Sequence, residues 1–415
     1  MYDLVSLGKN ARKAARQLIT LDTAAKNAGL LAIAAKLREN KSAILEANRL
    51  DIANAEASGV RTVMIDRLTL TSERIDGIAA AAEEVVALPD PVGAIDEGLT
   101  RPNGLRIVKT RVPIGVIAMI YEARPNVTVD AAVICLKSGN ACILRGGKEA
   151  YATNRVLVAL MREAVQSVGI PSDVISFVED TSHDTAERLM RLDGYVDLLI
   201  PRGSAKLIQS VVKHASVPTI ETGAGNCHVY VDSAADLDMA VDIVDNSKTQ
   251  RPSVCNSLET VLVHRNVAEK FLPMMKTALD SHNTELRGCP ETRAILKDIK
   301  PANESDWETE YNDYILAVKV VGGVDEAMDH IAKYSTGHSD GIVTDSVSAS
   351  HRFVAGVDSA AVYVNASTRF TDGGEFGLGA EIGISTQKLH ARGPMGLREL
   401  TSIKYIVTGD GQIRA

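Results

Sequence analysis

The first quarter of the chain has the hydrophobic pattern of packed helices. Between residues 10 and 57, apolar side chains recur every three or four positions, as at Leu30, Ile33 and Leu37, within a stretch rich in Ala, Lys, Arg and Glu. A further helix is predicted over residues 64–88, because two prolines follow it. This part of the chain is therefore predicted to be helical.

From residue 105 onward, short apolar runs alternate with helical patterns. The run at 114–120 has no charged residue, which is typical of a strand buried on both faces of a parallel sheet. A second alternating block begins after residue 245. The predicted strands span residues 105–112, 114–120, 141–145, 174–178, 196–200, 258–264, 315–321, 341–344, 360–365 and 401–408. Strands that alternate with helices predict a doubly wound α/β fold.

Length and charge narrow the classes of function. A chain of 415 residues is long enough for two or three domains, and its 45% apolar and 24% charged residues are the balance of a globular protein. The formal net charge of −8 opposes nucleic-acid backbones and anionic membrane surfaces. We therefore expect no nucleic-acid partner and no membrane partner.

Targeting and metal-binding signals are also missing from the sequence. Uncharged stretches reach only about ten residues, where a membrane span needs about 20, and the N-terminal residues lack the apolar core of a secretory signal. The five cysteines form no Cys-x-x-Cys pair, and no two histidines have helical metal-site spacing. We expect a cytoplasmic protein without disulfides or a bound metal.

Cys255 is a candidate reactive thiol. It lies in a polar turn that contains a proline and immediately precedes the strand predicted at 258–264. A thiol at that position would face a cleft between two α/β blocks. The alternative is that Cys255 is a small buried hydrophobic residue, as most cysteines are.

Glu221 is a candidate acid at the end of an apolar strand. The glycines at positions 223 and 225 permit a tight turn after it, and ligands of parallel sheets collect at the carboxyl ends of strands. A solvated loop acid is the alternative. The Gly-x-Gly sequence is a weak nucleotide signal, because position 228, where the third glycine of the dinucleotide fingerprint would stand, is His228.

Arg145 and Lys148 enclose two glycines between a strand and a helix. Backbone amides and the helix dipole favour an anion at such a corner, and two cations strengthen that interpretation. The alternative is a helix start with solvated basic side chains.

Long strings of residues carry a specific resemblance. They are Ile120–Asp130, Leu136–Asn140, Leu144–Gly147, Ile220–His228, Lys248–Asn256 and Val364–Gly379. Together they resemble the aldehyde dehydrogenase superfamily and, within it, the gamma-glutamyl phosphate reductase (glutamate-5-semialdehyde dehydrogenase) family. The resemblance spans nearly the whole chain and implies an aldehyde dehydrogenase-like α/β fold.

The resemblance implies an NADPH-dependent reduction of L-glutamyl 5-phosphate to L-glutamate 5-semialdehyde with release of phosphate, a step of proline biosynthesis. In that chemistry a thiolate attacks the acyl phosphate and the resulting thioester accepts a hydride. Cys255 matches the family's nucleophile, and Asn126 is the candidate oxyanion donor together with the Cys255 amide. Glu221 matches a glutamate that activates water in hydrolytic members of the superfamily. Since a reductase needs no such water, the role of Glu221 stays open.

The resemblance also implies a set of binding residues. Arg145 and Lys148 are expected to engage the 2′-phosphate of NADPH, and Glu310 matches an acid that reaches the nicotinamide ribose. The further cofactor-binding candidates are Arg202, Gly203, Ser204 and Gly223, and the candidates for the glutamyl group are Arg124 and Arg369.

Two positions depart from the family's pattern. Ser253 stands where the family commonly has glycine before Val-Cys, and Ser204 replaces the second glycine of a Gly-Gly pair. Both replacements are small, so they affect only how closely the backbone approaches the substrate and the cofactor.

The domain organisation implied is a cofactor-binding domain over 1–94 and 113–245, a catalytic domain over 246–385, and an oligomerisation element over 95–112 and 386–415. Exposed strand edges seek partners, so a homo-oligomer is expected. Contact with a separate glutamate kinase is a further expectation, since the chain leaves no room for a fused kinase before the reductase motifs.

Other functions would also use Cys255. They are the NAD(P)-dependent oxidation of another small aldehyde, a cysteine hydrolase, and an inactive scaffold. A hydrolase would need a base such as histidine, and the sequence around Cys255 offers none. The stretch at 365–374 favours the reductase.

Overall fold

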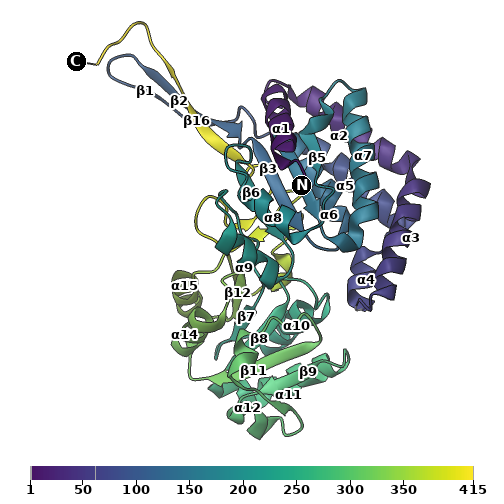
Figure 1. Ribbon diagram of the computed structural model, residues 1–415. Coiled ribbons are helices and arrows are strands. Elements are labelled where there is room, and N and C mark those ends of the chain that lie inside the picture. Colours follow the sequence, from purple (N-terminus) through teal and green to yellow (C-terminus); the bar gives the residue numbers. More distant parts are fainter. Residues whose placement is uncertain (1, 61, 415) are drawn as a thin grey trace. The chain divides into compact units, whose positions relative to one another are not determined.

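The computed structural model describes residues 2–60 and 62–414 and divides into two compact units (Figure 1). The first unit comprises Met1–Thr222, Gly377–Gly383 and Met395–Ala415, and the second comprises Gly223–Phe376 and Ile384–Pro394.

The first border lies after Thr222, not at residue 245 as the sequence pattern suggested. The reason is strand β7 (Cys227–Val231), which pairs with strands of the second unit. Helix α10 (Leu237–Thr249), which follows β7, therefore also belongs to the second unit.

The N-terminal segment is helical, as its pattern predicts. Polar side chains divide it: Asp22 accepts a hydrogen bond from the Ala25 amide at the start of α2, and Thr71 accepts one from the Arg74 amide at the start of α5. The helix predicted over 64–88 is therefore interrupted. These helices are α1 (Leu4–Leu18), α2 (Thr23–Glu39), α3 (Lys41–Ala57), α4 (Thr62–Leu68) and α5 (Ser72–Ala87).

A parallel sheet with strand order β5-β4-β3-β6 forms the centre of the first unit. Every residue of β3 is buried, which the uncharged run predicted, and its alternate residues Val116, Ala118 and Ile120 pack with apolar residues of α1, α8 and α9. The strands are β3 (Val116–Tyr121), β4 (Ala141–Gly146), β5 (Ile175–Phe177) and β6 (Leu198–Arg202), and the helices are α6 (Pro125–Lys137), η1 (Lys148–Ala150), α7 (Tyr151–Ser167), η2 (Ser172–Val174), α8 (His183–Met190) and α9 (Ala205–His214).

A separate antiparallel sheet, β1-β2-β16, extends away from the helices of the first unit (Figure 1). Its strands are β1 (Ile95–Thr100), β2 (Arg106–Pro113) and β16 (Thr401–Thr408). Strand β16 lies at the edge and exposes large apolar side chains, among them Tyr405 at 60% and Val407 at 55%.

The second unit is built on a parallel sheet with strand order β10-β9-β11-β8-β7-β12-β13. The strands are β7, β8 (Leu258–His264), β9 (Glu285–Gly288), β10 (Lys300–Pro301), β11 (Ile315–Val321), β12 (Ser339–Val343) and β13 (Ala361–Val364). The other elements are α10, α11 (Arg265–Asp280), α12 (Pro290–Ile295), α13 (Glu304–Glu308), α14 (Val324–Tyr334), α15 (Val347–Gly356), η3 (Thr368–Phe370) and the short pair β14 (Ile384–Ser385) and β15 (Gly393–Pro394).

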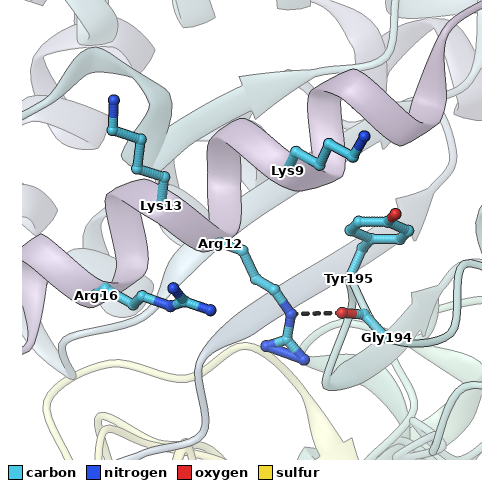
Figure 2. A pocket seen from close by; sticks show the side chains of 6 residues that line it. All are labelled: Lys9, Arg12, Lys13, Arg16, Gly194 and Tyr195. Atoms are coloured by element: carbon cyan, nitrogen blue, oxygen red, sulfur yellow. Dashed lines mark hydrogen bonds between the residues drawn. The ribbon is translucent and has the colours of Figure 1, made fainter.

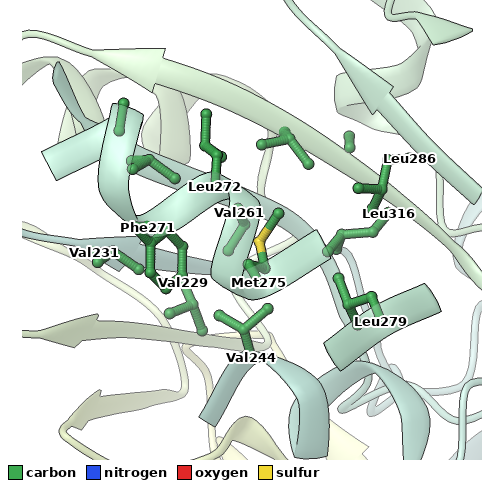
Figure 3. Close-up of a cluster of buried hydrophobic side chains, with 14 of the residues drawn as sticks. Val229, Val231, Val244, Val261, Phe271, Leu272, Met275, Leu279, Leu286 and Leu316 are labelled. Atoms are coloured by element: carbon green, nitrogen blue, oxygen red, sulfur yellow. The ribbon is translucent and has the colours of Figure 1, made fainter. Parts of the chain in front are cut away.

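Helices cover both faces of this sheet. Val229 and Val261 pack against Phe271 of α11 on one face (Figure 3), while Tyr230 and Leu262 of the same strands pack toward α14 and α15 on the other. This alternation confirms the α/β fold with a parallel sheet buried on both sides. No helix in the described part of the chain has the length and apolar character to cross a membrane.

Candidate active site

The cofactor-binding candidates of the first unit follow neighbouring strands of its parallel sheet. Tyr121, at the end of β3, is paired with Gly146 on one side and with Arg202 on the other. Since parallel strands end at the same edge, the residues after β3, β4 and β6 lie along one edge, where open parallel sheets bind their ligands.

Arg145 and Lys148 have different surroundings at this edge. Arg145 Nη2 donates to the carbonyl oxygens of Thr181 at 2.6 Å and Ser182 at 3.2 Å, and burial lowers the pKa of its guanidinium. Its buried Nε has no hydrogen-bond partner among the described residues. Lys148 begins η1 and is exposed. An exposed ammonium and an unsatisfied buried donor fit an anionic group of a cofactor.

Glu122 binds Ser204, the residue that caps the start of α9. The sequence pattern did not indicate this contact. Glu122 Oε2 accepts the Ser204 amide at 2.8 Å and Glu122 Oε1 accepts the Ser204 hydroxyl at 2.9 Å. A methyl group on Gly203 would lie 2.6 Å from Glu122 Oε2, so a larger residue there would displace the Glu122 carboxylate. Ser204, which replaces the second glycine of the Gly-Gly pair, thus donates its hydroxyl to Glu122, a hydrogen bond that glycine could not make.

Asn126 lies in the first turn of α6, where its orientation is set by Asp130. Asn126 Nδ2 donates to Asp130 Oδ2 at 2.9 Å. Burial raises the pKa of Asp130 to about 6, although the Asn126 hydrogen bond and the charge of Arg202 act in the opposite direction. An amide nitrogen carries two hydrogens, so the second N–H of Asn126 can serve another acceptor. Only the i,i+4 spacing could have indicated Asp130 from the sequence.

Glu221 follows a short segment that extends the same sheet. The Leu199 amide donates to the Pro218 carbonyl at 2.9 Å and the Ile220 amide donates to the Leu199 carbonyl at 3.1 Å, so the segment lies beside β6. The structure therefore places the half-buried Glu221 at the carboxyl edge, although the segment forms a single bridge and not a full strand.

Cys255 lies in the second unit, in the turn between α10 and β8. It is half-buried, whereas the other four cysteines are buried. The neighbouring Asn256 fixes this turn, since its Nδ2 donates to the Arg369 and Thr371 carbonyls at 3.2 and 3.0 Å and its own carbonyl accepts the Thr368 hydroxyl at 2.7 Å. Cys255 is thus the least buried of the five cysteines, and it lies on a turn that Asn256 holds in place.

Arg369 lies against the Cys255 turn. Its Nε donates to Gln250 Oε1 at 2.8 Å, and its Nη1 contacts Asn256 Oδ1. Burial and the nearby charge of Arg251 lower the pKa of the Arg369 guanidinium, and Cys255 acts in the opposite direction. A neighbouring cation favours the thiolate form of a cysteine.

Glu310 and Gly223 are held by backbone contacts within the second unit. Glu310 Oε1 accepts the Gly225 amide at 2.9 Å, and the Gly223 amide donates to the Ile384 carbonyl at 2.9 Å. Gly225 packs against Cys255 so closely that an added methyl group would overlap the Cys255 carbonyl oxygen. The structure therefore brings Gly223, Cys255, Glu310 and Arg369 into one unit, while the other candidates belong to the first.

The first unit also contains a basic groove, of about 580 Å³, that holds none of the expected site residues (Figure 2). Arg12 spans it, with Nε donating to the Gly194 carbonyl at 2.5 Å and Nη2 paired with Asp197 at 3.0 Å. Gly194 precedes β6, so the groove does not share the carboxyl edge described above. Its lining residues are Lys9, Arg12, Lys13, Arg16, Gly194 and Tyr195.

Known proteins resemble this chain over its full length. The aldehyde dehydrogenase family pattern matches residues 3–294. The gamma-glutamyl phosphate reductase of Caldanaerobacter subterraneus subsp. tengcongensis is 56% identical over 98% of both chains, and that of Carboxydothermus hydrogenoformans is 55% identical over 100% of both.

Solved structures agree with this relationship. The crystal structure of the gamma-glutamyl phosphate reductase of Thermotoga maritima matches with a TM-score of 0.98 at 50% identity, covering 100% of both chains. An acetylating aldehyde dehydrogenase from Geobacillus thermoglucosidasius shares the fold, with a TM-score of 0.72 at 18% identity over 100% of this chain and 98% of that one. The chain therefore belongs to the aldehyde dehydrogenase family and, within it, to the gamma-glutamyl phosphate reductases.

Proposed function

We propose that this chain reduces L-glutamyl 5-phosphate to L-glutamate 5-semialdehyde with NADPH and releases phosphate. The observation that carries this proposal is an accessible cysteine, Cys255, on a rigid turn beside the cation Arg369, in a chain that is 56% identical to a gamma-glutamyl phosphate reductase.

The reaction begins at the Cys255 thiolate, which Arg369 stabilises. Sulfur attacks the acyl carbon, the bond from that carbon to the phosphate oxygen breaks, and phosphate leaves with the electron pair, so that Cys255 carries a thioester. When bound, the nicotinamide cofactor supplies the hydride that takes the thioester to the aldehyde level. The carbon–sulfur bond then breaks, and Cys255 regains its thiolate.

On the first unit, we assign the oxyanion contact to the second N–H of Asn126, whose amide Asp130 orients. The assignment of Asn126 rests on its place in the first turn of α6 and on this fixed orientation. Glu221 is assigned to the same edge, with a role in proton transfer or in shaping the cofactor site.

Membership of the aldehyde dehydrogenase family supports a nicotinamide cofactor. Our choice of NADPH rests on Lys148, because an exposed ammonium at the start of a helical segment complements a 2′-phosphate. Arg202, Gly203 and Ser204 would lie near the cofactor at the same edge, since they follow the neighbouring strand β6.

The antiparallel sheet supports a homo-oligomer. Strand β16 leaves one edge unpaired within the described chain and exposes apolar side chains, and both features favour pairing with a second copy. The contact with a separate glutamate kinase stays a prediction.

The test is the reverse reaction, followed by absorbance of the reduced nicotinamide. With L-glutamate 5-semialdehyde present, we expect NADP⁺ reduction that requires phosphate and that Cys255→Ala abolishes. Cys289→Ala is the matched control, because Cys289 is a buried cysteine of the same unit. Reduction without phosphate would favour an ordinary aldehyde oxidiser, and no reduction with either nicotinamide would favour a hydrolase or an inactive scaffold.

A further inference from the structure

Two buried charges flank the Cys255 turn. Lys248 lies near the end of α10 and Glu259 near the start of β8, and Lys248 Nζ lies 2.7 Å from Glu259 Oε2. Both side chains are 0% exposed. The nucleophile turn therefore begins and ends beside a fully buried ion pair.

Burying an ion pair in a protein core is energetically unfavourable, because both charges lose their hydration. Burial raises the pKa of Glu259 and lowers that of Lys248, so the loss of hydration outweighs their attraction for each other. Apolar side chains of similar volume often stabilise a protein as well or better. A role beyond core packing is therefore expected.

The second oxygen of Glu259 reaches a neighbouring loop. Glu259 Oε1 accepts the backbone N–H of Asn312 at 3.3 Å, and Asn312 is in the left-handed conformation with φ of 55°. Tyr311 is fixed at the same time, because its hydroxyl donates to Asp306 Oδ1 at 2.8 Å and its ring lies 6.0 Å from Lys248 Nζ. The ion pair thus holds the segment that follows Glu310.

That segment in turn contacts the nucleophile turn. Glu310 Oε1 accepts the Gly225 amide at 2.9 Å, and Gly225 packs on the Cys255 carbonyl. The same carbonyl accepts the Cys227 thiol at 3.2 Å. A continuous path of contacts therefore runs from Lys248 and Glu259 through the 310–312 segment to Cys255, all within the second unit.

We propose that Lys248 and Glu259 are positioning residues: they fix the 310–312 segment, which holds Gly225 against the Cys255 carbonyl and so sets the direction of the Cys255 thiol. This inference rests on the proposed role of Cys255 as the nucleophile. It assigns to the ion pair no contact with substrate or cofactor.

The test measures the thiol directly, without substrate or cofactor. Cys255 is alkylated with iodoacetamide across a pH series, and kcat and KM are measured separately. In Lys248→Met and Glu259→Gln we expect alkylation at neutral pH and kcat to fall about tenfold or more, with KM for the aldehyde changed by less than about threefold. The double variant should be no worse than the poorer single variant, because the two residues act as a unit.

A second pair of variants acts further along the path and leaves the buried charges in place. Glu310→Leu removes the acceptor for the Gly225 amide and should slow alkylation, whereas Glu310→Gln keeps an acceptor oxygen and should restore it. Asp280→Asn, which breaks the exposed Lys276–Asp280 pair of α11, is the control and should leave alkylation unchanged.

These outcomes separate the inference from a purely structural role. Folded Lys248→Met or Glu259→Gln protein with an unchanged alkylation profile would overturn it, and so would unchanged alkylation in Glu310→Leu. If the buried variants do not fold, the Glu310 variants decide. Because alkylation needs no turnover, an error in the proposed reaction would appear only in the activity measurements.

Discussion

Gly225 packs so closely against Cys255 that any side chain on its α-carbon would overlap the Cys255 carbonyl oxygen. The obstructing atom belongs to the backbone, so it cannot move aside by changing a rotamer. This contact joins the loop after Glu221 to the Cys255 turn, and it explains a glycine that no turn conformation requires.

We expect Gly225→Ala to displace the Cys255 turn. Overpacking of this kind destabilises a protein by about 1–3 kcal/mol, and the shift should lower both alkylation of Cys255 and kcat by about tenfold or more. Gly323→Ala is the matched control in the same unit, since an added methyl group there meets nothing within 4 Å. Equal activity of the two variants would contradict the close contact.

Cys255→Ala should abolish phosphate-dependent reduction of NADP⁺, because no thioester can form without the sulfur. Binding of the cofactor, measured by titration calorimetry, should survive. Retention of more than a few per cent of the activity would rule out Cys255 as the nucleophile.

Lys148→Glu should weaken NADPH and leave NADH nearly unchanged. A charge-assisted hydrogen bond contributes roughly 1.5–3 kcal/mol, so the KM for NADPH should rise by about 10- to 150-fold. Arg145→Ala should add a loss of stability, because Arg145 also donates to the Thr181 and Ser182 carbonyls. Parallel increases of both Michaelis constants would mean that these cations serve the shared pyrophosphate or the fold.

Asp130 should make the stability of the first unit depend on pH. Burial raises its pKa to about 6 from 3.8, so the folded chain holds a proton that the unfolded chain releases between these values. The stabilisation from Asp130 is therefore present below about pH 4 and is lost as the pH rises through about 6.

Asp130→Asn removes this titration. The difference in free energy of unfolding between the variant and the unchanged chain should therefore increase from pH 4 to pH 7. The increase should be at most about 3 kcal/mol, because each unit of pKa shift corresponds to 1.36 kcal/mol. Urea denaturation at each pH measures the difference, with Asp280→Asn as an exposed control. A difference that does not vary with pH would show that Asp130 titrates normally.

Charges on β16 should disrupt the proposed homo-oligomer. Tyr405→Asp combined with Val407→Asp places two carboxylates on one face of the exposed edge strand, and the mass from light scattering should fall to that of a single chain. Lys404→Asp, on the opposite face of the same strand, is the control. An unchanged mass for the double variant would exclude this strand as the interface.

The sequence by itself determined the elements whose pattern is local. The uncharged run at 114–120 is typical of a strand buried on both faces, and most of it lies in β3. The helical periodicity of residues 10–57 corresponds to helices, whose ends are set by capping side chains such as Asp22. The residues around Cys255 likewise predicted a polar turn before a strand, and the structure places Cys255 between α10 and β8.

Only the tertiary structure decided which distant segments meet. Strand β7 belongs to the second sheet because β8 and β12 pair with it on both sides. The side-chain pattern of β7 does not indicate which strands it pairs with. Glu122 meets Ser204, and Glu259 reaches Asn312, across long separations in sequence. Such contacts depend on the order and register of strands, and neither propensity nor spacing carries that information.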